Sequence, residues 1–260
     1  MTPELIDSLG DALHAALAAR HTIEPLTSRH PDITLDAAYR VQQRMLARRL
    51  DGGETVIGKK IGVTSKAVMD MLGVYQPDFG YLLSGMVYGE GQTIATDTLI
   101  QPKAEGEIAF VLKKELLGPG ITNAAVLAAT ECVMPCFEIV DSRIRDWKIK
   151  IEDTVADNAS CGVFVLGDRA VAPSCVDLST CGMVLEKNGQ VIATGAGAAA
   201  LGSPVNAVAW LANTLGRLGI PLKAGEVILS GALAAMAVVK PGDHFRMSLG
   251  GIGSCAVRFA

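Results

Sequence analysis

The feature that most constrains the fold is a series of short apolar segments, separated by turn-forming residues, that runs from Val56 to the end of the chain. Apolar runs of about four to eight residues between Gly, Pro and Asn are typical of β-strands. These segments predict a domain rich in β-structure. The predicted strands are 56–62, 96–100, 105–112, 136–141, 162–166, 181–186, 190–195, 226–230, 244–248 and 253–258.

Two turns are indicated in the β-rich region. Lys187-Asn188-Gly189-Gln190 separates two of the apolar runs, and Asn-Gly favours the type I′ turn of a two-residue β-hairpin. Pro241-Gly242-Asp243 marks a second turn. We therefore expect the two strands beside the first turn to pair in antiparallel fashion.

The first 55 residues are predicted to be helical instead. Thr34 is a candidate N-cap for one helix, which Asp51-Gly52-Gly53 ends. We expect residues 1–55 to pack as a helical N-terminal segment on a main domain formed by residues 56–260. An earlier helix is indicated by one apolar residue at every fourth position, namely Leu5, Leu9, Leu13 and Leu17.

Two further helices interrupt the β-rich region. One is predicted from about residue 123 to just before Pro135. The other covers residues 203–218, where Pro204 suits the first turn and Gly219 can end the helix. A few helices mixed irregularly with strands predict an α+β fold, and they argue against a doubly wound sheet, in which strands and helices alternate.

Composition argues against several classes of protein. Half of the residues are hydrophobic and 19% are charged, which is enough apolar material for a large core. A net charge of −4 without a basic stripe argues against a nucleic-acid partner. The longest apolar run, Ala232 to Val239, is too short to span a membrane, and the acidic N-terminus lacks the features of a signal peptide. We therefore expect a cytoplasmic protein whose cysteines are core thiols, a metal pair at Cys132 and Cys136 being the weaker alternative.

Three glutamates lie in segments that otherwise look like buried strands. Glu105 and Glu107 are two residues apart, so they share one face of their strand, opposite Ile108 and Phe110. Glu138 has a similar apolar frame in a later strand. Three carboxylates in one cleft repel one another, and a divalent cation removes that repulsion. Oxygen ligands without a nearby histidine favour Mg²⁺ or Mn²⁺, with positions left for water and a chelating substrate.

The same glutamates have a second interpretation, in which they face solvent on an edge strand. Spacing alone does not place a strand within a sheet. The residues by themselves therefore leave both interpretations open.

Longer stretches carry a resemblance to a known family. They are GKKIGVTSKAVMDMLGVYQPDFGYL (58–82), IQPKAEGEIAFVLKKELLGPG (100–120), CFEIVDSRIRDWKIKIEDTVADNAS (136–160) and GAGAAALGSPVNAVAWLAN (195–213). The chain resembles 2-oxopent-4-enoate hydratases, also called 2-hydroxypenta-2,4-dienoate hydratases, of aromatic meta-cleavage catabolism. The resemblance extends nearly end to end. Related families are the 4-oxalocrotonate decarboxylases and the wider fumarylacetoacetase-like superfamily.

The resemblance implies both a fold and a metal site. The fold would be a β-rich roll or sandwich with a metal at its mouth, and residues 56–260 would form the catalytic domain. The metal ligands of the family match Glu105, Glu107 and Glu138, with Mg²⁺ or Mn²⁺ as the cofactor.

The resemblance also implies three residues that act on the substrate. Lys60 would support the charge of an enolate or carboxylate, or donate a proton, and strand alternation allows only one of Lys59 and Lys60 to face the pocket. Asp78 and Ser160 would move protons and orient water. Each has a structural alternative: a solvated lysine, a turn-forming aspartate and a small loop residue.

The implied reaction adds water to 2-hydroxypenta-2,4-dienoate and gives 4-hydroxy-2-oxopentanoate, with the metal as Lewis acid. The nearest alternative is 4-oxalocrotonate decarboxylase. A fumarylacetoacetase-type C–C hydrolase is another, with His30 near Asp32 as a candidate base on a lid. A non-catalytic subunit of a decarboxylase complex is a third. The resemblance further implies a homo-oligomer and an association with the decarboxylase.

Overall fold

The fold contains two β-sheets, described in a computed structural model for residues 1–66, 69–70 and 73–260. The strands of the larger sheet are β1 (Val56–Gly62), β2 (Asp78–Leu83), β3 (Val87–Gly89), β5 (Lys103–Leu112), β6 (Thr130–Val140), β7 (Cys161–Leu166), β10 (Val227–Leu229) and β11 (Ala237–Val238). Their order is β2–β1–β10–β5–β6–β7–β3, and β11 pairs separately with β5. The central pairs β10–β5, β5–β6 and β6–β7 are antiparallel, whereas β1–β10 and β3–β7 are parallel.

The smaller sheet closes one side of the core. Its strands are β4 (Thr93–Ile94), β8 (Gly182–Lys187), β9 (Gln190–Ala196), β12 (His244–Leu249) and β13 (Gly253–Phe259). Their order is β4–β13–β12–β8–β9. Phe137 of β6 meets Phe245 of β12 edge to face at a centroid distance of 6.3 Å, so the two sheets pack against each other as a sandwich.

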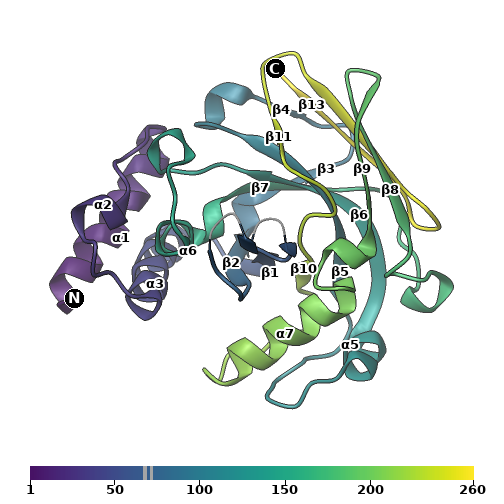
Figure 1. The fold of residues 1–260 in the computed structure, drawn as a ribbon, viewed down its shortest axis with the longest axis horizontal. Helices are drawn as coiled ribbons and strands as arrows, with labels where there is room; N and C mark the ends of the chain where they lie inside the picture. Colours follow the sequence, from purple (N-terminus) through teal and green to yellow (C-terminus); the bar gives the residue numbers. More distant parts are fainter. Residues whose placement is uncertain (67–68, 71–72) are drawn as a thin grey trace.

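Helices surround the sheets, with α1 to α3 at the side of the molecule opposite the smaller sheet (Figure 1). The α-helices are α1 (Pro3–Ala19), α2 (Leu26–Arg29), α3 (Leu35–Asp51), α5 (Asn123–Ala129), α6 (Ile151–Ala156) and α7 (Pro204–Gly216). The short 3₁₀ helices are η1 (Ser84–Met86), η2 (Thr96–Thr98), η3 (Arg145–Trp147), η4 (Asn158–Ser160), η5 (Pro173–Cys175) and η6 (Gly197–Ala199).

The N-terminal helices have a small apolar core of their own. Leu9 and Leu13 of α1 pack with Val41 of α3 and Val155 of α6. Gln42 of α3 is fully buried and donates hydrogen bonds to the backbone oxygens of Phe79 and Val155. The helical segment is therefore fastened both to β2 and to the helix that follows β6.

Several local predictions agree with the structure. The α+β class, the paired strands β8 and β9 and the helix starting at Pro204 are all present. Thr34 caps α3 by accepting a hydrogen bond from the Ala37 backbone. Asn188 and Gly189 have φ angles of 52° and 78°, as the type I′ turn requires.

Three local predictions were wrong. Residues 96–98 were predicted to lie in a strand but form a 3₁₀ helix. The Thr96 and Thr98 hydroxyls donate hydrogen bonds to backbone oxygens, and such local bonds compete with strand pairing. The helix from 123 ends at Ala129, because the following residues pair with β5 as strand β6, and Pro135 lies inside that strand. Strand β2 was not predicted, because Asp78 and Gly80 are poor strand formers.

Candidate functional site

Two neighbouring strands bring the three glutamates together. In the antiparallel register of β5 and β6, Glu105 lies directly opposite Glu138, and Glu107 follows on the same face. One carboxylate oxygen of each lies within 4.8 Å of the others. Glu107 and Glu138 are 1% and 0% exposed, whereas Glu105 is partly exposed. The interpretation in which these acids face solvent on an edge strand is therefore wrong.

A glycine between the two acids lets the sheets approach. A Cβ atom at Gly106 would lie 2.6 Å from the Met247 sulfur and 2.8 Å from the Met183 sulfur, both in the smaller sheet. The same strand thus presents a close-packed face to the core and an acidic face to the other side. In Glu105-Gly106-Glu107, the glycine therefore faces the tightly packed core and the two glutamates face the opposite side of the sheet.

Several carboxylate oxygens in this cluster lack hydrogen-bond partners. Glu107 Oε2 accepts a 2.7 Å hydrogen bond from the Gly231 backbone, but Glu107 Oε1 and both oxygens of Glu138 have no such partner. Lys60 Nζ lies 3.1 Å from Glu138 Oε1, an ion pair without hydrogen-bond geometry. Buried carboxylates without partners are costly, and a hard divalent ion would supply what these oxygens lack. The donor set fits such an ion.

The crowded acids resist ionisation. Burial and then the Glu138 carboxylate raise the pKa of Glu105 to about 7. Burial, followed by Glu138 and Glu105, raises the pKa of Glu107 well above its ordinary value. Burial also raises the pKa of Asp78, although Lys60 opposes this. At neutral pH, the cluster is thus strained by its own negative charge unless cations neutralise it.

A pH dependence of stability follows for the protein stripped of divalent ions. A raised folded-state pKa favours folding below the unfolded pKa, and this advantage is lost as pH rises through the folded value. For Glu105 that window runs from 4.5 to about 7, a loss on the order of 3 kcal/mol. Glu107 and Asp78 act in the same direction.

Urea unfolding at several pH values, in EDTA and in excess Mg²⁺, measures this effect. The free energy of unfolding should fall with pH in EDTA, and Mg²⁺ should remove most of the fall because the ion prefers ionised ligands. Identical slopes in both buffers would contradict an ion at this cluster.

Two basic residues of β1 point to opposite faces of the sheet. Lys60 meets Glu138, and burial, which alone would lower its pKa, is outweighed by Glu138 and Asp78, which raise it. Lys59 meets Glu226 at 2.6 Å on the other face. The structure therefore places Lys60, and not Lys59, beside the glutamates.

Asp78 joins the same buried group. It is 2% exposed, begins β2 and stands opposite Gly62 of β1. Its Oδ1 has no hydrogen-bond partner. A Cβ atom at Gly62 would lie 2.2 Å from that Oδ1 and 3.4 Å from Lys60 Nζ, so the missing side chain makes room for both charged groups.

Replacing Gly62 by alanine should therefore displace Asp78 and Lys60. We expect kcat/KM to fall roughly 100-fold, because displacement of about 1 Å in a reacting group has effects of this size. The matched control is Gly182→Ala, also in a strand, where a Cβ would meet no atom within 4 Å. Near-normal kcat/KM in Gly62→Ala would show that the placement of Asp78 and Lys60 is unimportant.

Ser160 lies in a tight turn rather than at an open surface. Asn158, Ala159 and Ser160 have φ angles of 54°, 52° and 52°, a left-handed run that is unusual outside glycine. Ser160 is 3% exposed, and its hydroxyl lies 3.0 Å from the Thr154 hydroxyl. Both backbone polar groups of Tyr81 hydrogen-bond to the Asn158 side chain, which fixes the turn against β2.

Sequence reasoning missed the groups that hold this turn. Arg143 is fully buried and pairs with Asp157 at 2.5 Å, and its other nitrogens bond to backbone oxygens of Asp141, Asp157 and Cys161. It also missed the Cys161 thiol, whose pKa is raised by burial and by the Glu138 carboxylate. Segment 139–161 contains several acids and bases, so the sequence did not indicate which of them would form the buried pair.

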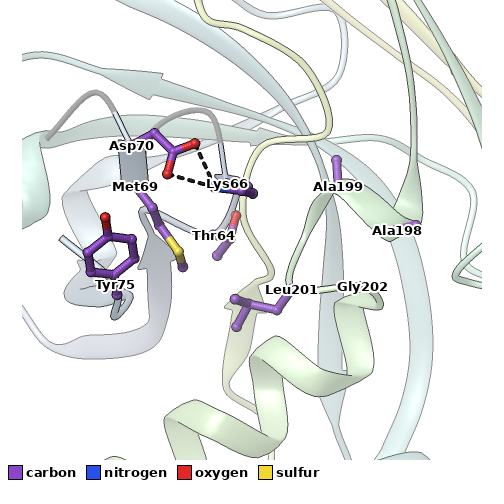
Figure 2. Close-up of a pocket in the computed structure, with 9 residues that line it drawn as sticks. All are labelled: Thr64, Lys66, Met69, Asp70, Tyr75, Ala198, Ala199, Leu201 and Gly202. Atoms are coloured by element: carbon purple, nitrogen blue, oxygen red, sulfur yellow. Dashed lines mark hydrogen bonds and ion pairs between the residues drawn. The ribbon is translucent and has the colours of Figure 1, made fainter. Parts of the chain in front are cut away.

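A pocket of about 400 Å³ opens near the cluster (Figure 2). Thr64 connects the two, because a Cβ on Gly231 would lie 2.2 Å from the Thr64 hydroxyl and the Gly231 backbone bonds to Glu107. Figure 2 shows Lys66 and Asp70 joined by an ion pair at one side. The pocket is lined by Thr64, Lys66, Met69, Asp70, Tyr75, Ala198, Ala199, Leu201 and Gly202.

Other predicted features lie elsewhere. His30 follows α2 in the N-terminal segment, and no histidine belongs to the carboxylate cluster among the residues that the structure describes. All six cysteines are free thiols. Within the described ranges, no helix has the length and apolar character needed to cross a membrane.

Comparisons with known proteins agree with this architecture. Residues 62–260 match the family described as fumarylacetoacetate (FAA) hydrolase C-terminal. The chain is 69% identical over 221 residues to a 2-hydroxypent-2,4-dienoate hydratase of Pseudomonas putida, covering 85% of this chain and all of that one. It is 56% identical to a 2-hydroxyhexa-2,4-dienoate hydratase of Comamonas testosteroni, covering 98% of each.

A solved structure resembles the whole chain. The 4-oxalocrotonate decarboxylase of Pseudomonas putida G7, complexed with magnesium and adipate, superposes with a TM-score of 0.97 at 38% identity. The match covers 100% of this chain and 99% of the other. The predicted family and fold are therefore confirmed: the chain belongs to the hydratase and 4-oxalocrotonate decarboxylase family, within the fumarylacetoacetate hydrolase superfamily.

Proposed function

We propose that the protein is a metal-dependent hydro-lyase that adds water to 2-hydroxypenta-2,4-dienoate and forms 4-hydroxy-2-oxopentanoate. The observation that carries the proposal is the buried cluster of Glu105, Glu107 and Glu138, with unpartnered oxygens and Lys60 beside it. The identity of 69% to a dienoate hydratase, against 38% to the decarboxylase, favours hydration over loss of carbon dioxide.

The three glutamates would hold Mg²⁺ or Mn²⁺, and the magnesium in the related decarboxylase supports this choice. When bound, the ion would act as a Lewis acid toward a 2-oxo or 2-hydroxy acid. The glutamates balance its charge and keep it inside a largely buried site.

The chain's own residues would provide the remaining chemistry. Lys60 holds a permanent positive charge beside Glu138, where it can stabilise negative charge that develops on the substrate. Asp78 is buried beside Lys60, and burial raises its pKa, so it would serve as the group that exchanges a proton with a substrate carbon. Ser160 and Thr154 share one hydroxyl contact, which would position Ser160 to orient water.

Two assays test the reaction. The protein is stripped with EDTA and then titrated with Mg²⁺ or Mn²⁺ while the ultraviolet absorbance of the dienoate and the formation of 4-hydroxy-2-oxopentanoate are followed. Release of carbon dioxide from 4-oxalocrotonate is measured in parallel. We expect metal-dependent hydration without release of carbon dioxide. If carbon dioxide release is the faster reaction, the protein is a decarboxylase and the proposed hydratase function is wrong.

Assembly forms part of the same proposal. We expect a homo-oligomer that can associate with a decarboxylase of the same fold. Sedimentation of the protein alone, and mixed with such a decarboxylase, tests both expectations.

A further inference from the structure

A third lysine lies near the glutamate cluster, where it interacts with the charge of Glu105 but forms no close ion pair among the described residues. Lys103 is two residues before Glu105 on β5, so both side chains project from the same face of the sheet. Lys103 is half-buried, and its Nζ lies 4.1 Å from the centroid of the Trp147 ring. Among the described residues, it forms no ion pair and donates no hydrogen bond.

The neighbouring lysines differ in this respect. Lys59 and Lys60 each have a carboxylate within contact distance. Lys187 also lies over an aromatic ring, that of Phe245, but it pairs with Asp243 at 2.8 Å. Lys103 therefore keeps ammonium donors available, because a ring face satisfies only part of the bonding capacity of three N–H groups.

The indole that holds Lys103 is itself fixed. Trp147 Nε1 donates a 3.0 Å hydrogen bond to the backbone oxygen of Gln101. The Gln101 side chain in turn donates to the backbone oxygens of Ser142 and Ile144 at 2.8 and 2.5 Å. Trp147 has a left-handed φ of 55°, a conformation that persists only where its surroundings enforce it.

We propose that Lys103 and Trp147 form a carboxylate-binding subsite at the open side of the glutamate cluster. Glu105 is the most exposed of the three glutamates, so an anionic ligand that reaches the cluster from that side meets Lys103. The ligand of the subsite would be the carboxylate of a 2-oxo acid. This identification rests on the proposed function. Its oxygens would accept charge-assisted hydrogen bonds from the half-buried ammonium.

Oxalate binding to the Mn²⁺-loaded protein tests the subsite without any turnover. Calorimetry should show that Lys103→Met raises the Kd of oxalate roughly 10- to 100-fold, as expected for one lost hydrogen bond between charged groups. The Kd of Mn²⁺ without oxalate should stay the same or decrease, because a positive charge beside Glu105 is removed. Lys103→Arg should restore oxalate binding to within a few-fold, and Trp147→Leu should give an intermediate loss.

The matched control is Lys148→Met, which removes an exposed lysine from the same loop. It should leave the oxalate Kd within about twofold, since exposed charges are well screened. An unchanged oxalate Kd in both Lys103→Met and Trp147→Leu would overturn the subsite. So would a parallel loss of Mn²⁺ affinity in these variants, which indicates a purely structural role.

Two substrates identify which carboxylate is bound. If Lys103→Met raises the KM of the five-carbon dienoate and the inhibition constant of dicarboxylic 4-oxalocrotonate equally, the subsite binds the C1 carboxylate. An increase confined to 4-oxalocrotonate assigns it to the second carboxylate. Lys103-dependent oxalate binding in a wild-type protein that does not hydrate the dienoate would retain the subsite and reject the proposed function.

Discussion

Replacing Glu107 by glutamine is expected to abolish tight divalent-ion binding and to lower turnover at least about 100-fold, with the fold retained. Even residues that only orient metal ligands typically cost 10- to 100-fold when removed. A neutral amide is a weaker ligand for a hard ion than a carboxylate. The glutamine oxygen can still accept the Gly231 hydrogen bond that Glu107 Oε2 accepts now, so the local packing is preserved.

The same substitution should stabilise the metal-free protein. Glu107 is 1% exposed, and its pKa is raised by burial, by Glu138 and by Glu105. Removing its charge relieves that repulsion, so the Tm in EDTA should rise at pH 8. Added Mg²⁺, which should raise the Tm of the wild-type protein, should do little for Glu107→Gln.

Melting curves with and without Mg²⁺, combined with dienoate turnover, distinguish a ligand from a structural acid. The control is Glu131→Gln in the neighbouring strand β6, where the side chain is 63% exposed. This variant should keep both turnover and the response to Mg²⁺. A Glu107→Gln protein that is less stable in EDTA and responds normally to Mg²⁺ would remove Glu107 from the proposed site.

Local sequence patterns predicted the strands that build the site. The apolar runs at 105–112 and 136–141 correspond to β5 and β6, and residues 56–62 form β1 as predicted. Alternation along a strand placed Glu105 and Glu107 on one face, because that property depends on backbone geometry alone. The family resemblance, rather than spacing, linked them to Glu138 on another strand.

The remaining parts of the site depend on long-range packing. The β5–β6 register sets Glu105 opposite Glu138, and register between strands is not encoded in either strand alone. Asp78 looked like a turn residue because it follows Pro77, yet it is buried in β2 beside Lys60. Such a placement is stable only because β1 lacks a side chain at Gly62.

The contacts that surround the glutamate cluster could not be predicted from the sequence either. The pairing of Arg143 with Asp157 and the stacking of Lys103 on Trp147 each join residues from a turn or loop to a distant segment. Charged residues in loops are usually solvated, so no local pattern indicated that these residues would be buried. Their positions became apparent only with the sheet in place.

A comparison of Lys60→Met with its matched control Lys59→Met is expected to distinguish a role of the Lys60 charge in catalysis from a role in stability. The two lysines are adjacent, 3% and 2% exposed, and each pairs with one glutamate. Removing either leaves a buried carboxylate without its cation, which should destabilise the protein by about 3 to 5 kcal/mol at pH 8. For Lys60→Met the loss should be smaller at pH 5, because Glu105, whose pKa is raised to about 7, takes up a proton and relieves part of the repulsion in the cluster.

Activity and metal affinity should then diverge between the two variants. Lys60→Met should lose about 100-fold or more in kcat, as is typical when one charge-stabilising donor is removed. Its Mn²⁺ affinity should increase, because the ion no longer competes with an ammonium group for Glu138. Lys59→Met should keep both kcat per folded molecule and Mn²⁺ affinity, since Glu226 lies on the other face of the sheet. Equal kinetic losses in the two variants would mean that Lys60 acts through folding alone, and the role of its charge in the reaction would have to be abandoned.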